Sequence, residues 1–505
     1  MLEHQMHLIS NLNFLKERGM SNAELITLDT ELPDNIQIEQ TRTAALTIRC
    51  NNILLHSAYD PVKEAQRFIE AQNLQPGDRV LLCGFGLAYH VKEVLTRIGP
   101  QGKLIIFEPN FDVMNAALIL VDFREIFAQH EVYLIAGRTE GHLAMRLSAL
   151  LSRHFADVSE KKKKVVIHLP SYHCFPEHLI SIKESFDLLL LERKASEVFG
   201  DLERENFIKN LDITLASPNI EKLRKVFHGK PAILISAGPS LDIVLGSLRE
   251  YVDKAFIFTA DTSYPFLQKA GITPDVVFSV DPQADTIKHF SYSEKDHALL
   301  IALPTMDTHS LHKYSGPKMC IIQKDNSITK KLEQHFENKA FTHAGGAVSC
   351  IALDVMFQLG CEPIIFAGMD YAFPLNKYYS TNTIEMKKWY RDVNRFNTIE
   401  MMHYEVIKNN KVRYVENNSG KRIPTHETLY LYLRQIEEII SRNPKRHVYN
   451  LMSQGSKIQG TDRINNIKKL DKILKRSLDK TTLTLRDEPV DQSVKDKIME
   501  EVARV

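Results

Sequence analysis

The sequence predicts an α/β protein of two or three domains built on parallel sheets, and three observations lead to that prediction. The chain has 505 residues, more than one compact core usually organises. Hydrophobic residues make up 44% of it and charged residues 25%, the proportions of a globular protein. Short apolar runs alternate with amphipathic stretches in two blocks, and this alternation is typical of parallel sheets covered by helices.

The first block predicts a Rossmann-like N-terminal domain over residues 1–200. Its candidate strands read "RVLLC", "KLIIFE", "EVYLIA" and "KVVIHLP". The first strand runs into a turn at Gly84-Phe85-Gly86, and Glu108 ends the second. A glycine turn followed one strand later by an acid is typical of dinucleotide and S-adenosylmethionine sites, where the carboxylate binds ribose hydroxyls. The third glycine of that fingerprint is missing, so a tight turn that binds nothing is the competing interpretation.

The rest of the chain is predicted in three parts. Residues 201–229 read as a helical connection, and residues 230–460 as a central, mostly parallel α/β domain. Its candidate strands read "AILIS", "AFIFTA", "DVVFSV", "ALLIAL", "MCIIQ" and "PIIFAG". A C-terminal helical segment is expected over residues 461–505, where one helical stripe would hold Ile464, Ile467, Leu470, Ile473 and Leu474.

The turn Gly238-Pro239-Ser240 follows the first strand of the central domain and is a candidate phosphate site. Gly238 permits close approach of a ligand to the backbone, Pro239 fits a first helical turn, and Ser240 is a suitable helix cap. The N–H groups and dipole of a helix start suit a phosphate. An ordinary strand-to-helix turn is the alternative.

Carboxylates follow the next two strands of this domain. Asp261, beside Thr262, ends one strand, and Asp281 ends the other. Because the carboxyl ends of parallel strands share one edge of a sheet, we expect these side chains to face a ligand with the Gly238 turn. Carboxylates at this position accept hydrogen bonds from ribose hydroxyls or a base edge.

A second glycine-opened helix comes later in the central domain. Gly345-Gly346 precedes an apolar helix that contains Ser349, and a later strand ends at Gly368-Met369-Asp370-Tyr371. Tyr378 lies in the loop beyond it. We take Gly345, Gly346, Ser349, Gly368 and Asp370 as substrate-binding candidates, and the tyrosines as hydrogen-bond donors to a leaving phosphate.

Composition and motifs exclude several other functions. A net charge of +1 gives no overall attraction to nucleic acid. No apolar run has the roughly 20 residues of a membrane span, and the first residues do not read as a secretory signal. The six cysteines form no C-x-x-C pair, which favours a reduced, cytoplasmic protein. The 20 histidines show no metal-binding spacing, so we expect no metal site.

The motif series resembles a known family. "ILISAGPSLD", "TADTSYP", "GITPDVVFSVDPQ" and "GGAVSCIALDVMFQLGCEPIIFAGMDYAF" are similar to the motility accessory factor (Maf, DUF115) glycosyltransferases, as is the upstream stretch "GDRVLLCGFGLAYHVKEVL". That resemblance implies transfer of a nonulosonic acid, of the pseudaminic or legionaminic type, to serine and threonine hydroxyls of flagellin, which flagellum assembly and motility require.

The central domain also resembles, more distantly, the bacterial sialyltransferases that use CMP-sialic acid. That likeness implies an inverting transfer from a CMP-activated donor without a required cofactor. It gives Tyr371 and Tyr378 the role of stabilising the departing CMP, and gives His426, before a helix, the role of general base. This chain departs from the sialyltransferases at Ala237, where they have asparagine, and at Asp261 and Asp281, which replace two more asparagines.

Two alternatives stay open at this stage. An archaeal group of 6-hydroxymethylpterin diphosphokinases shares the G-P-S-L turn and the aspartates, and such an enzyme would use ATP and Mg²⁺. A non-catalytic flagellin chaperone could retain the same nucleotide fold.

Overall fold

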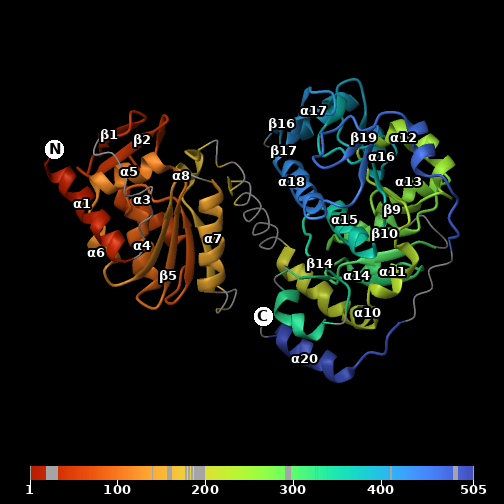
Figure 1. Cartoon of the computed structure of the whole chain (residues 1–505), viewed down its shortest axis with the longest axis horizontal. Coiled ribbons are helices and arrows are strands. Elements are labelled where there is room, and N and C mark those ends of the chain that lie inside the picture. Colours follow the sequence, from red (N-terminus) through yellow and green to blue (C-terminus); the bar gives the residue numbers. More distant parts are fainter. Residues whose placement is uncertain are drawn as a thin grey trace. The chain divides into compact units, whose positions relative to one another are not determined.

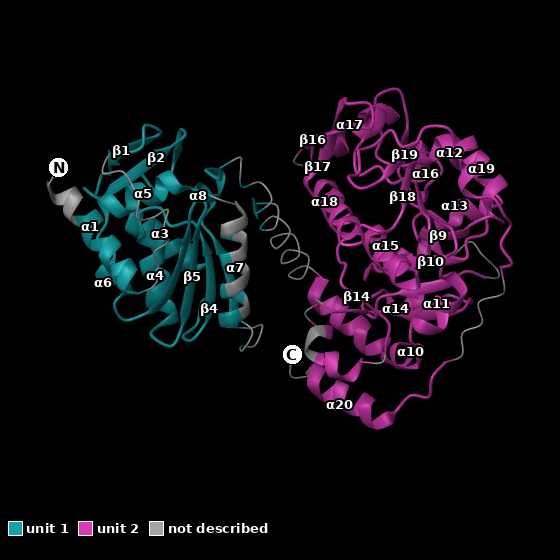
Figure 2. Cartoon of the chain, viewed as in Figure 1, with its two compact units in different colours: residues 1–187 teal, residues 188–505 magenta. Residues whose placement is uncertain are grey.

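The computed structural model describes residues 2–18, 32–138, 140–155, 162–176, 199–290, 297–324, 328–337, 339–409, 412–480 and 487–503, with a few single positions between these ranges. The chain divides into two compact units, residues 1–187 and residues 188–505 (Figure 2). The segments 201–229 and 461–505, which we treat separately in the sequence, both belong to the second unit. The domain boundaries inside that unit stay a prediction.

The first unit is built on a four-stranded parallel sheet with the order β6-β5-β4-β7. All four strands expected from the sequence form, as β4 (Arg79–Cys83), β5 (Lys103–Glu108), β6 (Glu131–Ala136) and β7 (Lys163–Ile167). Helices link and cover them (Figure 1): α1 (Leu2–Glu17), α3 (Pro61–Glu70), α4 (Tyr89–Ile98), α5 (Phe111–Leu120), α6 (Arg124–Phe127), α7 (Glu140–Phe155) and α8 (Leu169–His173).

A small antiparallel sheet precedes the Rossmann-like strands of the first unit. It consists of β1 (Ile36–Gln40), β2 (Leu46–Cys50) and β3 (Ile53–Leu54). The sequence pattern does not predict this sheet, because its strands are short and carry polar residues.

The second unit contains an eight-stranded sheet with the order β12-β11-β10-β9-β8-β15-β18-β19, and every pair in it is parallel. The order reverses between β8 and β15, and ligands of open α/β sheets bind beside such a reversal, at the carboxyl ends of the strands. The strands are β8 (Ala232–Ile235), β9 (Phe256–Ala260), β10 (Val276–Ser279), β11 (Leu299–Ala302), β12 (Lys318–Cys320), β15 (Ile364–Ala367), β18 (Val448–Leu451) and β19 (Asp462–Ile464).

Both faces of this large sheet are buried, which explains why its strands are apolar at every position. In β8, Ala232 and Leu234 belong to a core with α15 (Val348–Leu359), whereas Ile233 and Ile235 belong to a core with α12 (Leu241–Leu248). The other helices on the core strands are α10 (Leu211–Ala216), α11 (Glu221–Phe227), α13 (Tyr264–Lys269) and α14 (Thr308–Lys313).

An insertion between β15 and β18 builds a layer at the carboxyl edge of the sheet. Helix α18 in this insertion packs against α15 (Figure 1). Its elements are α16 (Ile384–Asp392), α17 (Ile399–Lys408), the hairpin β16 (Val412–Glu416) and β17 (Arg422–His426), and α18 (Glu427–Ser441).

The C-terminal region corrects one expectation. The predicted stripe does not lie on one helix: Ile464 ends strand β19, a short 3-10 turn follows, and α19 is only Leu470–Ile473. The stripe residues nevertheless pack in one core cluster, as a docked segment should. The chain then continues to α20 (Gln492–Ala503). The α/β class, with two parallel sheets, is confirmed.

Candidate active site

The turn after β8 is held by the chain's own groups. Gly238 N–H donates to the carbonyl of Gly368 at 3.0 Å, and the N–H groups of residues 241–243 donate to carbonyls of residues 238–240. The sequence predicts that the Ser240 side chain caps α12, and this prediction is wrong. Its hydroxyl instead accepts a hydrogen bond from the backbone N–H of Gln454 at 2.8 Å. Since Pro239 has no N–H, a phosphate at this turn would have to displace an existing bond.

Asp370 supplies the anion that this turn binds. Its carboxylate accepts hydrogen bonds from Ser240 N–H at 2.7 Å, and from Ser453 Oγ and Gly455 N–H at 3.1 Å each. Burial raises the pKa of Asp370 above its ordinary value, while these hydrogen bonds lower it. A side chain at Gly238 would collide with Asp370 and with the Gly368 carbonyl, which is why glycine is needed there.

The N-terminus of α15 is the open anion position of the same edge. Ala347 precedes the helix and has no capping side chain. Among the residues that the structure describes, no acceptor pairs with the N–H groups of Val348 or Ser349. The backbone before them has a positive φ at Gly346, and a side chain there would meet the ring of Tyr432. A helix start without its own cap suits a phosphate.

Tyr371 points its phenol at this helix start. Its hydroxyl lies 2.8 Å from Ser349 Oγ, and burial raises its pKa well above the ordinary value, so it stays a hydrogen-bond donor at neutral pH. The backbone of Tyr371 has a φ of 47°, a left-handed conformation that non-glycine residues rarely adopt. Thr425 Oγ donates to the carbonyl of Tyr371 at 2.8 Å and holds this segment beside β17.

His426 lies at the end of β17 and caps α18, as its position before a helix predicts. Its Nδ1 accepts the N–H of Leu429 at 3.2 Å, so the neutral ring carries its proton on Nε2. Burial lowers the pKa of His426 below its ordinary value. In this geometry the free ring atom is the Nε2–H donor. His426 can act as a base only if Nδ1 releases the N–H of Leu429.

Tyr378 lies near His426 but is less buried. Its ring stacks on Phe373, with centroids 5.4 Å apart, and its centroid lies 6.4 Å from that of His426. Its backbone N–H donates to His403 Nδ1 at 3.2 Å. Burial raises the pKa of Tyr378, which also keeps this phenol protonated at neutral pH.

Asp261 and Asp281 lie at the carboxyl ends of β9 and β10, as expected. The Asp261 carboxylate is already satisfied, because it accepts from Ser279 Oγ at 2.5 Å and from Thr262 N–H at 2.7 Å. Asp281 accepts from Gln283 N–H at 2.9 Å, and burial raises its pKa. Asp281 therefore has more free acceptor capacity than Asp261.

The predicted residues thus form four groups. Gly345, Gly346, Ser349 and Tyr371 lie at the start of α15. Tyr378 and His426 lie close together on the insertion, with ring centroids 6.4 Å apart. Gly238, Pro239, Ser240, Gly368 and Asp370 form a hydrogen-bonded cluster, which we call the Asp370 cluster, and Asp261, Thr262 and Asp281 follow the neighbouring strands. Tyr379, next to Tyr378, is close enough to Asp261 for the aspartate charge to raise its pKa further, after the main effect of burial.

Residues 453–456 complete the Asp370 cluster and were not among the predicted site residues. Ser453 and Gly455 bind the Asp370 carboxylate, and Ser456 Oγ donates to the Asp370 carbonyl at 2.6 Å. The available signal was "SQGS", a run of small and polar residues that begins one residue after the strand "HVYNL".

The glycine turn of the first unit is closed as well. Glu108 is fully buried, and its carboxylate accepts from Phe85 N–H at 2.6 Å and from Asn110 N–H at 2.9 Å instead of facing a ribose. Burial raises its pKa to about 7. A cavity of about 230 Å³ lies nearby, lined by residues that include Asn35, Asn51 and Arg138.

Comparisons with known proteins agree with this organisation. Residues 31–158 match the family described as the glycosyltransferase Maf N-terminal domain. Residues 205–376 match the family described as 6-hydroxymethylpterin diphosphokinase MptE-like.

Individual relatives are more distant. An uncharacterized protein of Treponema pallidum (strain Nichols) is 35% identical over 85 residues, which are 17% of this chain and 40% of that protein. The 6-hydroxymethyl-7,8-dihydropterin pyrophosphokinase of Methanocaldococcus jannaschii is 25% identical over 203 residues, 38% of this chain and 82% of that protein. The solved Maf glycosyltransferase of Magnetospirillum magneticum AMB-1 aligns with 99% of this chain and 78% of its own, at 15% identity and a TM-score of 0.45.

The two family matches follow one another in the order that the motif series predicts. The match to the Maf N-terminal domain lies in the first unit, and the match to the MptE-like family lies in the second. Both matches support the resemblance of this chain to the Maf glycosyltransferases.

Proposed function

We propose that this protein transfers a nonulosonic acid, of the pseudaminic or legionaminic type, from a CMP-activated donor to serine or threonine hydroxyls of flagellin. The observation that carries the proposal is the open start of α15 beside the Ser349–Tyr371 pair, whose oxygens lie 2.8 Å apart. Its backbone N–H groups have no acceptor among the described residues and lie beside a phenol donor, and a departing nucleotide phosphate needs such donors.

In this proposal the donor phosphate binds at Val348 and Ser349. Charge develops on the phosphate as its bond to the anomeric carbon breaks, and the backbone N–H groups and the Tyr371 phenol stabilise that charge. The Tyr378 phenol donates a further hydrogen bond to the departing phosphate. No metal is required for this stabilisation, because hydrogen-bond donors supply it.

The acceptor hydroxyl attacks from the opposite face of the sugar, which inverts the anomeric centre, and it must lose a proton. His426 is the candidate base, and it would act after its Nδ1 releases the N–H of Leu429. If the cap stays in place, His426 acts instead as a donor through Nε2. The Asp281 carboxylate accepts fewer hydrogen bonds within the protein than that of Asp261. Asp281 is therefore the better candidate for binding hydroxyls of the sugar donor.

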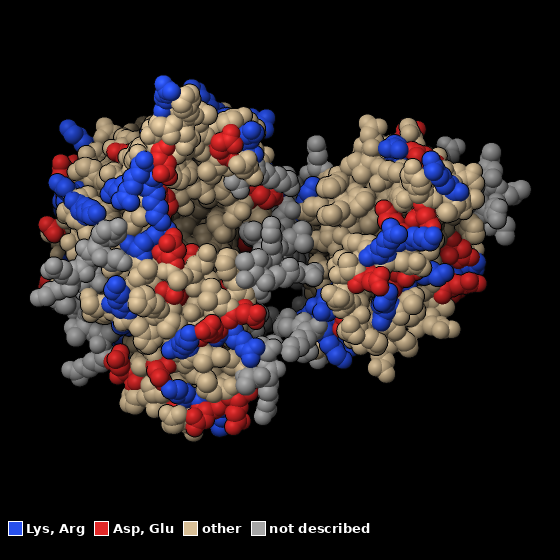
Figure 3. Space-filling model, turned by 180° about the vertical axis from the view of Figure 1, so that it is seen from behind, with Lys and Arg blue, Asp and Glu red and all other residues tan. Residues whose placement is uncertain are grey.

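The protein surface fits a protein acceptor better than nucleic acid. Positive and negative side chains are mixed across the face shown in Figure 3, and the second unit is hollowed there. Among the described residues, no helix is both long and apolar enough to cross a membrane. We propose a cytoplasmic enzyme that modifies flagellin before export.

Intact-mass analysis of flagellin tests the proposal. The protein is co-expressed with flagellin and a nonulosonic-acid pathway, and flagellin is weighed with and without it. A mass increase by whole nonulosonic-acid units is expected. Unchanged flagellin mass, with both proteins folded and the donor present, would overturn the proposal, and would leave the chaperone alternative.

A specific observation favours a second candidate function. The match of residues 205–376 to the MptE-like family supports transfer of diphosphate from ATP to a hydroxymethylpterin, with Mg²⁺ on the aspartates. Against it, the Asp261 carboxylate is satisfied within the protein. Incubation of the purified protein with ATP, Mg²⁺ and 6-hydroxymethyl-7,8-dihydropterin decides the matter: release of AMP would support this function, and its absence would remove it.

A further inference from the structure

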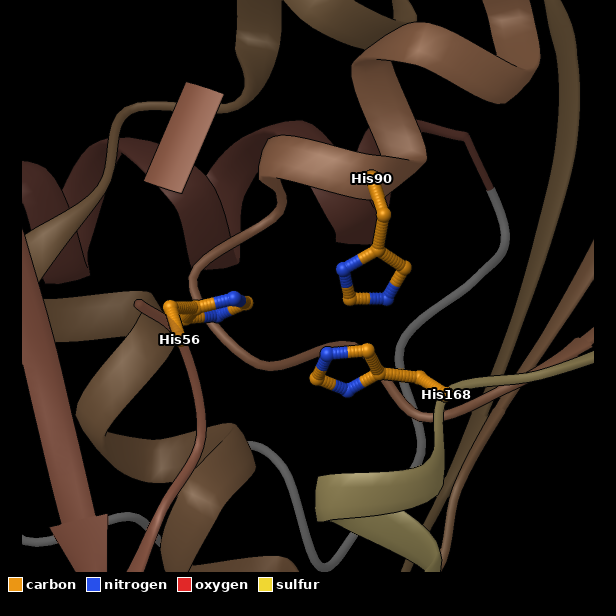
Figure 4. A group of neighbouring side chains, drawn as sticks. All are labelled: His56, His90 and His168. Atoms are coloured by element: carbon orange, nitrogen blue, oxygen red, sulfur yellow. The ribbon is translucent and has the colours of Figure 1, made fainter. Parts of the chain in front are cut away.

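Three buried histidines meet in the first unit, far from the proposed transfer site in sequence. His56 follows β3, His90 lies in the first turn of α4, and His168 follows β7 (Figure 4). The backbone N–H of His168 donates to the carbonyl of Cys83, the last residue of β4, at 2.9 Å. The cluster therefore lies at the carboxyl edge where β4 and β7 meet. The strand order of this sheet reverses there, which is the usual ligand position of an α/β sheet.

The three rings bring one nitrogen each close together. One ring nitrogen of each histidine lies within 4.8 Å of the other two, and the rings border one common space in Figure 4. The side chains are buried, with exposed fractions of 3%, 1% and 7% for His56, His90 and His168. His90 Nδ1 is buried and has no hydrogen-bond partner in the part of the chain that the structure describes, although buried polar side-chain atoms are mostly paired.

In two of the three rings, those of His90 and His168, one nitrogen is anchored by the protein. His90 Nε2 lies 2.9 Å from the carbonyl of Gly84, to which it donates, so its Nδ1 has a free lone pair. His168 Nδ1 lies 2.8 Å from Ser171 Oγ. Metal-binding histidines are normally held in this way, through their other nitrogen, by a carbonyl or a similar acceptor. His56 differs, because its Nε2 accepts the N–H of Leu87 at 2.8 Å.

Neutral imidazole is the form that binds a metal ion, and three such ligands suit Zn²⁺ and similar late transition metals.

We propose that His56, His90 and His168 form a binding site for one transition-metal ion of the Zn²⁺ class. Two adjustments accompany binding. His90 and His168 are stacked, with centroids 4.1 Å apart and planes at 15°, and must turn because the lone pairs of parallel rings do not converge on one ion. His56 must release Leu87 N–H or turn its ring. The site lies in the first unit and is independent of the proposed transfer reaction.

Metal titration of the full-length protein tests this proposal. The purified chain is treated with a chelator and titrated with Zn²⁺ by calorimetry, and with Co²⁺ by visible absorption, which reports the number and type of ligands. We expect one tight equivalent per chain, with a Co²⁺ spectrum of nitrogen ligation. Absence of tight binding in the wild-type chain would overturn the proposal and leave the cluster as a packed group of rings.

Matched variants assign the ion to this cluster. His90→Phe retains an aromatic ring in the stack but removes the unpartnered nitrogen, and His168→Ala removes a second ligand. The control is His447→Ala, an exposed histidine paired with Glu362 in the second unit. Binding should weaken at least roughly tenfold in the first two variants and stay unchanged in the control. Equal affinity in His90→Phe and the wild type would contradict the assignment.

A second measurement covers the case in which the variants fold poorly. Crystals of the wild-type chain grown with Zn²⁺ should show an anomalous peak among the three rings, with the stack of His90 and His168 opened. A peak only elsewhere on the chain, or an unchanged stack without a peak, would overturn the proposal.

Discussion

Asp370 Oδ2 accepts the backbone N–H of Ser240 at 2.7 Å, and this bond joins the loops after β15 and β8 where the strand order reverses. The carboxylate occupies the helix start that the sequence assigns to a phosphate. Its other oxygen accepts from Ser453 and Gly455, so the loop after β18 is tied in as well. Among the described residues, the start of α15 beside Tyr371 is a helix start at this edge that has no side-chain cap.

Replacement of Asp370 should therefore act mainly on stability. Asp370→Ala removes the acceptor of the buried Ser240 N–H and of the Ser453 hydroxyl, and one of the two acceptors of Gly455 N–H, so we expect a loss of about 3 kcal/mol. Asp370→Asn keeps an amide oxygen for part of this network and should lose less. Thermal unfolding of the two variants and the wild type checks the order. If Asp370→Ala melted at the wild-type temperature, the hydrogen bonds of Asp370 would not stabilise the fold as we infer.

Tyr371→Phe should affect transfer rather than folding. It removes the hydroxyl next to Ser349 but retains the ring, so the rate should fall roughly tenfold to a thousandfold with little change in melting temperature. The matched control is Tyr404→Phe, since Tyr404 is 60% exposed on α17. Rates of CMP release from the donor provide the readout. Equal rates for Tyr371→Phe and the control would remove the phenol from the mechanism.

His426 can be tested separately as a cap and as a catalytic group. Asparagine is a good helix cap, so His426→Asn should retain most of the stability, whereas His426→Ala should lose about 1 kcal/mol. Both variants lack the imidazole, and their transfer rates should fall roughly a hundredfold or more. Wild-type activity in His426→Asn would show that the residue only caps α18.

The pH dependence of transfer follows from the neutral state of His426. Burial lowers its pKa below the ordinary value of 6.5, so the neutral ring persists on the acid side of that value. The rate should hold steady from neutral pH to below 6.5 and then fall as the ring becomes protonated. A pH–rate profile of the wild type, compared with His426→Asn, checks this acid limb. An acid limb that begins above pH 6.5 would contradict the assignment.

Glu108 should make the first unit less stable as pH rises. Its pKa is raised from 4.5 to about 7 in the fold, so the folded state favours the protonated acid. This contribution is complete below pH 4.5 and is lost as pH rises through about 7, an effect of about 3 kcal/mol. Glu108→Gln should lose that slope. Hydrogen exchange of β4 and β5, corrected for intrinsic rates, measures how the stability of the first unit depends on pH. An equal pH dependence in Glu108→Gln and the wild type would contradict the raised pKa of Glu108.

The strands were predictable because both faces of each sheet are buried. Runs such as "AILI" and "PIIFA" have no polar side, and only a covered parallel sheet accommodates them. The C-terminal stripe misled the helix prediction, since Ile464 reaches its core position from a strand and Leu470 from a short helix. Spacing alone could not separate these arrangements.

The site was predictable in composition but not in its bonding. The strand ends located Ser240, Asp370 and Tyr371 at one edge, and the structure brings them there. The sequence could not show that Asp370 satisfies Ser240, because these residues are 130 positions apart. The histidine cluster escaped for the same reason: His56, His90 and His168 come from distant segments and match no short metal motif.

A structure of the protein with CMP bound tests the central claim most directly. We predict that the phosphate accepts hydrogen bonds from the N–H groups of Val348 and Ser349, within reach of the Tyr371 hydroxyl, while the Asp370–Ser240 bond stays intact. CMP bound at the Gly238 turn with Asp370 displaced, or CMP bound only in the first unit, would contradict this account.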